Sequence, residues 1–142
     1  MESAQEPSDD YASEFSIRYN SDDRLLPGFW ADKGKQVIDQ NYARLSGVAD
    51  VCNELGLSPS RFRDVFYAAF GITPKLYLNK IRIEHSKSLL ITTQNNIREI
   101  EMIVGFKERS VFERTFKKLV GVTPSNFRRR YRNTAGDFVA RK

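Results

Sequence analysis

Apolar side chains recur at helical spacing along most of the chain. Val48, Val51, Cys52 and Leu55 stand at i, i+3, i+4 and i+7, the spacing that places side chains on one face of an α-helix. The same period returns further on, in Phe62, Val65, Phe66 and Ala69, in Ile97, Ile100 and Val104, and in Phe112, Phe116, Leu119 and Val120. No stretch sustains the alternation of apolar and polar residues that is typical of a strand. The pattern predicts an all-α fold.

Start and stop signals divide this pattern into seven predicted helices. Ser58 precedes Pro59, and Asn96 precedes Glu99 by three residues, so Ser58 and Asn96 are predicted N-caps, the second within a capping box. Ser46 or Gly47 is expected to cap the helix that begins at residue 48. Glycines follow several periodic segments, where a left-handed residue commonly ends a helix. We predict helices over residues 32–42, 48–55, 59–70, 74–91, 97–104, 109–120 and 125–132.

The two ends of the chain lack a sustained helical period. Residues 1–31 are predicted to form an acidic, largely irregular arm that contains a turn at Leu25–Gly28, because Pro and Gly in succession favour turns. Residues 134–142 are predicted to fray. The folded domain is therefore expected to cover residues 32–133.

One segment of the sequence occurs twice. Residues 56–74 (GLSPSRFRDVFYAAFGITP) match residues 105–124 (GFKERSVFERTFKKLVGVTP), with one residue inserted after the first Gly of the second copy. The match extends backwards, since Val51 and Leu55 correspond to Ile100 and Val104 at an offset of 49. Two copies are too few for a stacked solenoid. The repeat predicts two similar modules, one over residues 32–72 and one over residues 96–132, joined by a helix over residues 74–91.

Each module reads as helix, tight turn with Gly, helix, which is the spacing of a helix-turn-helix. In such a module the second helix can enter the major groove of DNA, where every base pair presents a distinct pattern of donors and acceptors. The connecting helix would be roughly 27 Å long at about 1.5 Å per residue. Recognition helices that read one face of B-DNA stand about 34 Å apart, so the connecting helix together with the widths of the helices it joins has about the required length.

Charge is spread unevenly over a chain whose net charge is +5. Residues 1–24 hold seven acidic side chains and two arginines, whereas residues 107–142 hold eleven Lys or Arg and three acidic residues. A basic globular part points to a polyanionic partner, although charge alone is equally explained by solubility. The single Cys excludes an internal disulfide and fits a reducing compartment.

The residues of these modules resemble the DNA-binding domain of the AraC/XylS family of bacterial transcription regulators. The resemblance spans about residues 33–132. It rests on LGLSPS at 55–60, GITP at 71–74, IREI at 97–100, VGF at 104–106, FERTFKK at 112–118 and GVTP at 121–124. It implies seven helices, two helix-turn-helix units and a long linker helix, a site read over about two turns of duplex DNA, and activators that touch RNA polymerase.

The resemblance also supplies candidate site residues. Those predicted to read bases are Ser60, Arg63, Asp64, Arg109, Ser110, Val111 and Arg114. Arg63 and Arg114 are the strongest of these, because Arg is the best reader of guanine, whereas Asp accepts only from cytosine N4. Those predicted to contact phosphates are Ser58, Arg61, Lys75, Lys107, Lys117, Lys118, Ser125, Arg128 and Arg129.

Three positions depart from what these roles require. Glu101 stands where the family usually has a small residue, at the close approach of the two helices of the second module. A Glu there must reach solvent or find a partner, because an unpaired buried charge is strongly unfavourable. Cys52 stands at the matching position of the first module and is expected to be a small core residue. Asp64 repels phosphate and is expected to weaken the first module.

Other classes of function have little support in the sequence. No run approaches the roughly 20 apolar residues of a membrane helix, and the acidic N-terminus does not read as a signal peptide. His85, the single His, has no companion ligands or nucleophile, so we expect neither a metal site nor an enzyme, and no cofactor. Only about 30 residues precede the domain, too few for a small-molecule-binding barrel. We therefore expect either a short stand-alone member or part of a longer regulator.

Two functions remain open at this point. The first is a cytoplasmic regulator at the bacterial nucleoid that binds duplex DNA in a sequence-specific manner and activates transcription, with RNA polymerase as a further partner. The second is a protein-interaction module of the same fold that has lost specific DNA binding, which Asp64, Glu101 and Glu113 favour.

Overall fold

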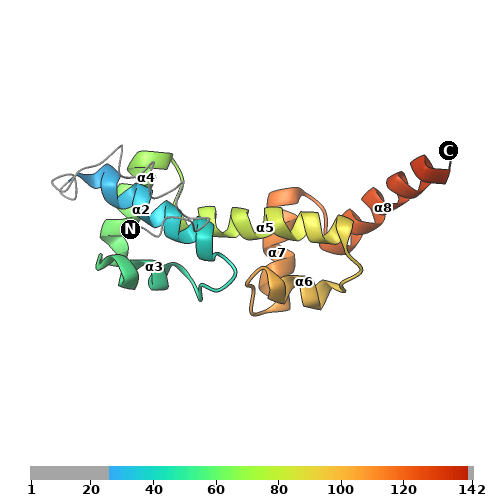
Figure 1. Ribbon diagram of the computed structural model, residues 1–142, viewed down its shortest axis with the longest axis horizontal. Coiled ribbons are helices and arrows are strands. Elements are labelled where there is room, and N and C mark those ends of the chain that lie inside the picture. Colours follow the sequence, from blue (N-terminus) through green and yellow to red (C-terminus); the bar gives the residue numbers. More distant parts are fainter. Residues whose placement is uncertain (1–25, 141–142) are drawn as a thin grey trace, which may run out of the picture. The chain divides into compact units, whose positions relative to one another are not determined.

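The computed structural model describes residues 26–140, and of residues 133–140 it describes the backbone alone (Figure 1). Within these residues it has seven helices and no strand, so the predicted fold class is confirmed. The helices are α2 (Pro27–Asn41), α3 (Val48–Leu55), α4 (Pro59–Phe70), α5 (Pro74–Thr92), α6 (Ile97–Ile103), α7 (Arg109–Val120) and α8 (Pro124–Ala140). None of these helices combines the length and the apolar character that crossing a bilayer requires.

The outer limits of the helical region differ from the prediction. Helix α2 begins at Pro27, five residues before the expected start, and takes up Pro27 and Gly28 of the predicted turn. Proline suits the first helical position, where its missing N–H would have no partner in any case, and burial of Phe29 and Ala31 anchors the added turn. Helix α8 runs to Ala140, so the backbone does not fray after Asn133. Of the arm predicted over residues 1–31, residues 1–25 lie outside the described residues.

The predicted helix starts are confirmed where side chains cap them. The Ser58 hydroxyl accepts a hydrogen bond of 3.2 Å from the backbone N–H of Arg61. Asn96 accepts from the N–H of Glu99 at 2.8 Å, and the Glu99 carboxylate accepts from the N–H of Asn96 at 2.9 Å, which completes the capping box. Gly47 is the N-cap of α3 and, having no side chain, makes no such bond.

The described chain divides into two compact units. The first comprises residues 26–40 and 47–75, which include α2, α3 and α4. Its core is built from buried side chains of all three helices, among them Ile38, Val51, Phe62 and Phe66. The rings of Phe62 and Phe66 lie edge to face, with centroids 5.5 Å apart. Ala69, which the periodicity assigned to this core, is exposed in the last turn of α4.

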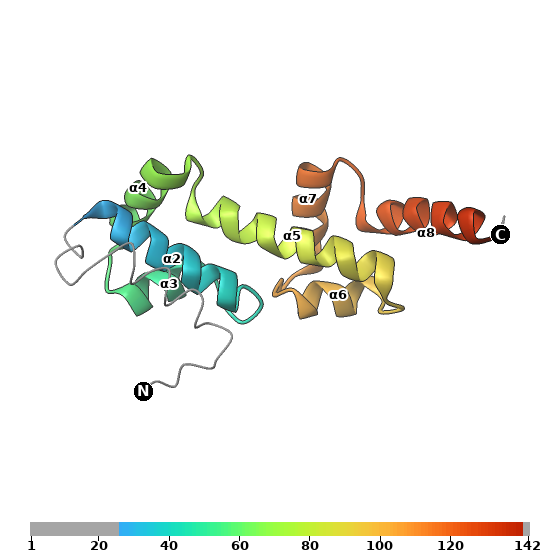
Figure 2. The same cartoon turned by 45° about the horizontal axis from the view of Figure 1, so that its top comes forward.

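The second unit comprises residues 41–46 and 76–140, with nearly all of α5 and the whole of α6, α7 and α8 (Figure 2). Its core contains four phenylalanines in a chain of ring contacts. Phe106 and Phe112, Phe112 and Phe116, and Phe116 and Phe127 have centroids 5.2, 5.8 and 5.6 Å apart. Phe112 and Phe116 are fully buried, as the sequence predicted.

Cys52 and His85 each pack against other side chains of their own unit. Cys52 is buried in the core of the first unit, as expected, and burial raises the pKa of its thiol. The exposed His85 ring stacks on Tyr42 within the second unit, with centroids 4.3 Å apart. Within the described residues there is no group of three or more His, Cys, Asp or Glu arranged to hold a metal ion.

Candidate nucleic-acid interface

Each unit contains a pair of helices with the geometry of a helix-turn-helix. In the first unit α3 ends at Gly56, whose φ of +74° is left-handed, and α4 follows after the cap at Ser58. In the second unit α6 is followed by Gly105, with φ +106°, and α7 begins at Arg109. A Cβ at Gly105 would also approach the backbone carbonyl oxygens of Tyr42 and Ala43 to 3.0 Å. Glycine is therefore required there by both conformation and space.

The outer face of α4 carries the residues predicted to read bases in the first unit. Ser60, Arg63 and Asp64 are all exposed. The Nε atom of Arg63 lies 3.9 Å from a carboxylate oxygen of Asp64, an exposed ion pair that contributes little to stability. Two cations predicted to contact phosphates, Arg61 and Lys75, are also exposed. The Ser58 hydroxyl is exposed as well, but it already serves as the cap of α4.

Tyr67 belongs to the same face and was not among the predicted site residues. It follows Ser60 by seven positions and Asp64 by three, so the three share one side of α4. Its side chain is 57% exposed, which is unusual for a large aromatic residue. The helical spacing from Ser60 and Asp64 was the signal in the sequence that could have identified it.

The outer face of α7 is more cationic. Ser110, Arg114, Lys117 and Lys118 are exposed along it, directly opposite the buried Phe112 and Phe116. In the part of the chain that the structure describes, the Arg114 side chain makes no hydrogen bond or ion pair. Val111 differs from the other predicted base readers, since it is half-buried and packs against the core of the second unit.

Arg109, the first residue of α7, contacts two carboxylates. Its Nε atom donates to Glu113 at 2.9 Å and lies 3.8 Å from Oε1 of Glu101. Glu101 is only 5% exposed, and among the described residues its Oε1 atom has no hydrogen-bond partner. Glu101 is thus largely withdrawn from solvent, and a cation lies at ion-pair distance from it.

The three predicted phosphate contacts on α8 are placed differently from one another. Arg128 is half-buried and donates to the carbonyl oxygens of Leu90 at 3.0 Å and Thr93 at 3.1 Å. Burial, together with the nearby charge of Arg132, lowers the pKa of Arg128. Arg129 is exposed and donates to the Asn126 side chain, and Ser125 is exposed beside it.

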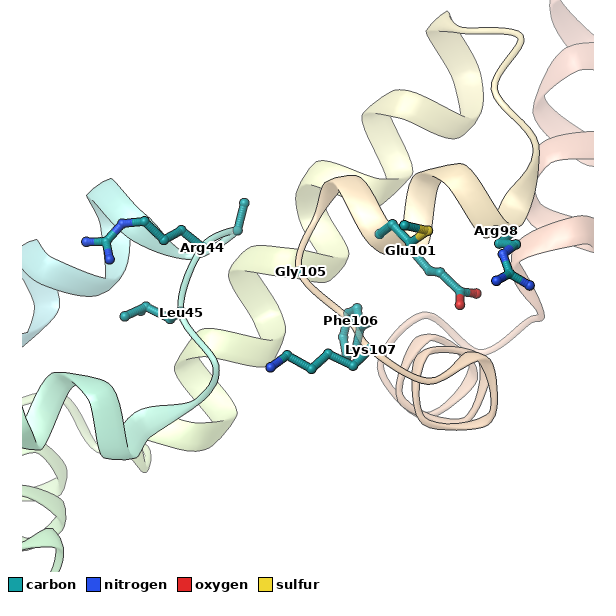
Figure 3. A pocket seen from close by; sticks show the side chains of 9 residues that line it. Arg44, Leu45, Arg98, Glu101, Gly105, Phe106 and Lys107 are labelled. Atoms are coloured by element: carbon teal, nitrogen blue, oxygen red, sulfur yellow. The ribbon is translucent and has the colours of Figure 1, made fainter.

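Beside the second helix-turn-helix lies a shallow cavity of about 390 Å³ (Figure 3). It is lined by residues 43–45 and by α6 with the turn that follows it, and Glu101 and Phe106 form part of its wall. Arg44, Arg98 and Lys107 line it as well. Lys107, a predicted phosphate contact, is exposed and donates to the Ser46 hydroxyl at 3.3 Å.

A family model described as a helix-turn-helix domain matches residues 51–130, more than half of the 142-residue chain. The chain belongs to the AraC/XylS family. The match includes both recognition helices, α4 and α7, and the whole of α5 between them.

Similar proteins and solved structures agree with this assignment. The raffinose operon transcriptional regulatory protein RafR of Pediococcus pentosaceus is 32% identical over 92 residues, 65% of this chain and 33% of RafR. The C-terminal domain of AraT, a response regulator from Geobacillus stearothermophilus, has a TM-score of 0.65 at 30% identity, covering 70% of this chain and 84% of that domain. The DNA-binding domain of AdpA, solved in complex with a target DNA, has the same fold, with a TM-score of 0.65 at 20% identity over 74% of this chain and 94% of that one.

The similarity to full-length AraC/XylS regulators is partial. The chain spans 33% to 43% of the length of curated relatives such as RafR. What is shared is the part with the two helix-turn-helix units.

Proposed function

We propose that this chain binds duplex DNA in a sequence-specific manner and regulates transcription. The observation that carries the proposal is the pair of recognition helices, α4 and α7, each buried through two phenylalanines and each with an outer face of polar and charged side chains. A recognition helix needs this division, because the inner face must hold it on its unit while the outer face meets base edges and phosphates.

Arg114 and Arg63 are proposed as the principal base readers. Both are exposed, and an Arg side chain can donate two parallel hydrogen bonds to O6 and N7 of guanine. Arg114 is the better placed, since it stands opposite Phe112 and Phe116 at the middle of the outer face of α7. Arg109, Ser110, Ser60, Asp64 and Tyr67, which are also exposed, would complete the readout.

Lys117, Lys118, Arg61 and Lys75 are proposed to contact phosphates. These four side chains are exposed and cationic, so each neutralised phosphate would release counterions and make the affinity depend on salt. The first turns of α5 and α8 offer backbone N–H groups that suit phosphate as well.

Activation through contact with RNA polymerase is the further part of the proposal. It is supported by membership of the AraC/XylS family. We infer with it that the protein acts in the cytoplasm of a bacterium, at the chromosome.

Selection of bound duplexes from a random pool tests the proposal. The expected result is an enriched motif, with an affinity that falls steeply as salt rises. Arg114→Ala should weaken binding by about 1–3 kcal/mol and relax the preference at one base pair. Lys33→Ala, which removes an exposed cation from α2, is the matched control and should leave the motif unchanged.

A protein-interaction role is the second candidate, and one observation favours it. The repeat places Asp64 at the position of Arg114, so the middle of the outer face of α4 carries an acidic side chain where α7 carries a basic one. If the selection enriches no motif, this candidate replaces the first.

A further inference from the structure

The most unusual side chain in the second helix-turn-helix is Glu101. It is a charged residue with 5% exposure, and its Oε1 atom has no hydrogen-bond partner among the described residues. Burying such a group is unfavourable unless a cation or donor compensates it. The cation at hand is Arg109, whose Nε atom lies 3.8 Å from that oxygen. The pair joins α6 to the first residue of α7, where a recognition helix meets base edges.

Both carboxylates that surround Arg109 approach the same nitrogen. Glu113 Oε2 lies 2.9 Å from Nε, and Glu101 Oε1 lies 3.8 Å from it on the inner side. A guanidinium has five N–H donors in a planar fork, and guanine takes only two of them, from the terminal nitrogens. Contacts at Nε therefore hold the side chain from behind and leave both terminal nitrogens for a base.

We propose that Glu101 is a positioning residue that holds Arg109 for bidentate recognition of a guanine. The proposal rests on the proposed function, since it assigns one base pair of the bound site to Arg109. Glu101 acts through Arg109 and touches no base itself.

The two carboxylates do not contribute equally to this arrangement. Glu113 and Arg109 are both about half exposed, so their pair is screened by water and salt and is easily exchanged. Glu101 is only 5% exposed, so its side of the pair is screened less by water and salt than that of Glu113. Among the described residues its Oε1 atom accepts no hydrogen bond, so its attraction for Arg109 is not shared with another donor. Glu101 therefore supplies the contact that persists when the interface is filled by DNA.

The test compares sites selected from a random duplex pool by the parent chain and by variants. Arg109→Ala should reduce the preference for guanine at one position by about 5- to 150-fold, the value of one bidentate contact. Glu101→Gln is nearly isosteric and removes the charge. It should reduce the preference at that same position by about threefold or more and leave the others unchanged. In Arg109→Ala, adding Glu101→Gln should have no further effect on the motif.

Glu108→Gln is the matched control. Glu108 is the exposed N-cap of α7, it lies next to Arg109 in the chain, and its side chain makes no capping hydrogen bond. This variant removes the same negative charge near the same helix end. It should raise overall affinity slightly by reducing repulsion of phosphate, and it should leave base preferences as they are.

A second variant at Arg109 separates a loss of base recognition from a loss of folding. Arg109→Lys keeps the cation beside Glu101 but removes Nε and the fork, so it should fold like the parent and still lose the preference for guanine at that position.

The outcomes separate this proposal from the function on which it rests. If the parent chain enriches no motif, the proposed function fails and the reading role of Arg109 fails with it. If the parent enriches a motif and Glu101→Gln keeps every base preference while folding normally, only the positioning role of Glu101 is overturned.

Discussion

The guanidinium of Arg82 donates a hydrogen bond of 2.6 Å to the carbonyl oxygen of Leu45. Its Nε atom donates to the carbonyl oxygen of Tyr42 at 2.9 Å, and the group lies 5.6 Å from the centroid of the Phe106 ring. The side chain is buried, and this burial lowers its pKa. One charged residue in α5 thus holds residues 41–46 within the second unit.

Replacing Arg82 by Met should destabilise the second unit by about 3 kcal/mol, because Met keeps much of the volume but leaves two carbonyl oxygens without their charged donor. The free energy of unfolding in urea, followed by circular dichroism, measures the loss. Lys80→Met, an exposed position on the same helix, is the control and should change stability by less than about 0.5 kcal/mol. Equal stability of the two variants would show that these hydrogen bonds are not required.

Gly34 sets the approach of α2 to the core of the first unit. A Cβ added at Gly34 would lie 2.2 Å from Cε1 of Phe62, a ring that is fully buried. Gly34→Ala should therefore destabilise the chain by about 1–2 kcal/mol, because overpacking outweighs the roughly 1 kcal/mol that Ala contributes to a helix. Thermal unfolding measures this loss.

Gly47 provides the comparison. Nothing lies within 4 Å of a Cβ at that position, which is the N-cap of α3. Gly47→Ser should be neutral or stabilise slightly, since Ser is a good N-cap. A Gly34→Ala variant as stable as Gly47→Ser would mean that Phe62 can move aside.

The fold could be predicted from the sequence because its main signals are local. The stripes that include Phe62 and Phe112 fix the inner face of each recognition helix, and the side-chain caps at Ser58 and Asn96 act within three residues. The start of α2 could not be predicted in this way. Pro27 and Gly28 are local turn formers, and it is the burial of Phe29 in the core that overrides them.

The candidate site was predictable only in part, for a related reason. Exposure of Arg114 follows from its spacing to Phe112 and Phe116, which the sequence contains. The pairing of Glu101 with Arg109 depends on how α6 and α7 pack, so the sequence indicated that Glu101 needs a partner but not which one. Likewise, the sequence alone suggests that Arg128 is a surface charge, because the carbonyl group to which it donates belongs to Leu90, 38 residues earlier in the chain.

Cys52 gives a prediction about pH. Burial raises the pKa of its thiol, so the folded chain favours the neutral form more than the unfolded chain does. The stability from this preference is fully present below about pH 8.5, the pKa of an unfolded thiol, and is lost as pH rises through the folded pKa. Above pH 8.5 the parent should lose stability relative to Cys52→Ala, which lacks this titration. Urea unfolding at several pH values measures the difference, and parallel curves for the two proteins would contradict the prediction.

The same residue should be chemically protected. Because the thiolate is the reactive form and Cys52 is buried, alkylation by iodoacetamide should be slow in buffer and accelerate as urea unfolds the chain. Fast labelling of the native protein would show that the first unit opens readily.

Arg128 and Arg129 are neighbours with the same charge, and the structure separates their roles. Arg128 satisfies carbonyl groups at the C-terminal end of α5, where a helix leaves its last carbonyls without internal partners. Arg128→Ala should therefore destabilise the chain by about 1–2 kcal/mol. This loss of stability lies at the lower end of the range for a hydrogen bond from a charged donor, because the Thr93 carbonyl also accepts from Arg132 and keeps that contact. Urea unfolding measures it.

Arg129 is exposed, so Arg129→Ala should leave stability within about 0.5 kcal/mol of the parent. If it contacts a phosphate, the slope of log affinity against log salt should fall by about 0.9 on duplex DNA. Measured together, the two variants distinguish a structural arginine from a DNA-binding one. A variant at Arg128 that keeps full stability but lowers the salt slope would instead return Arg128 to the DNA interface, and its hydrogen bonds to α5 would then be incidental to folding.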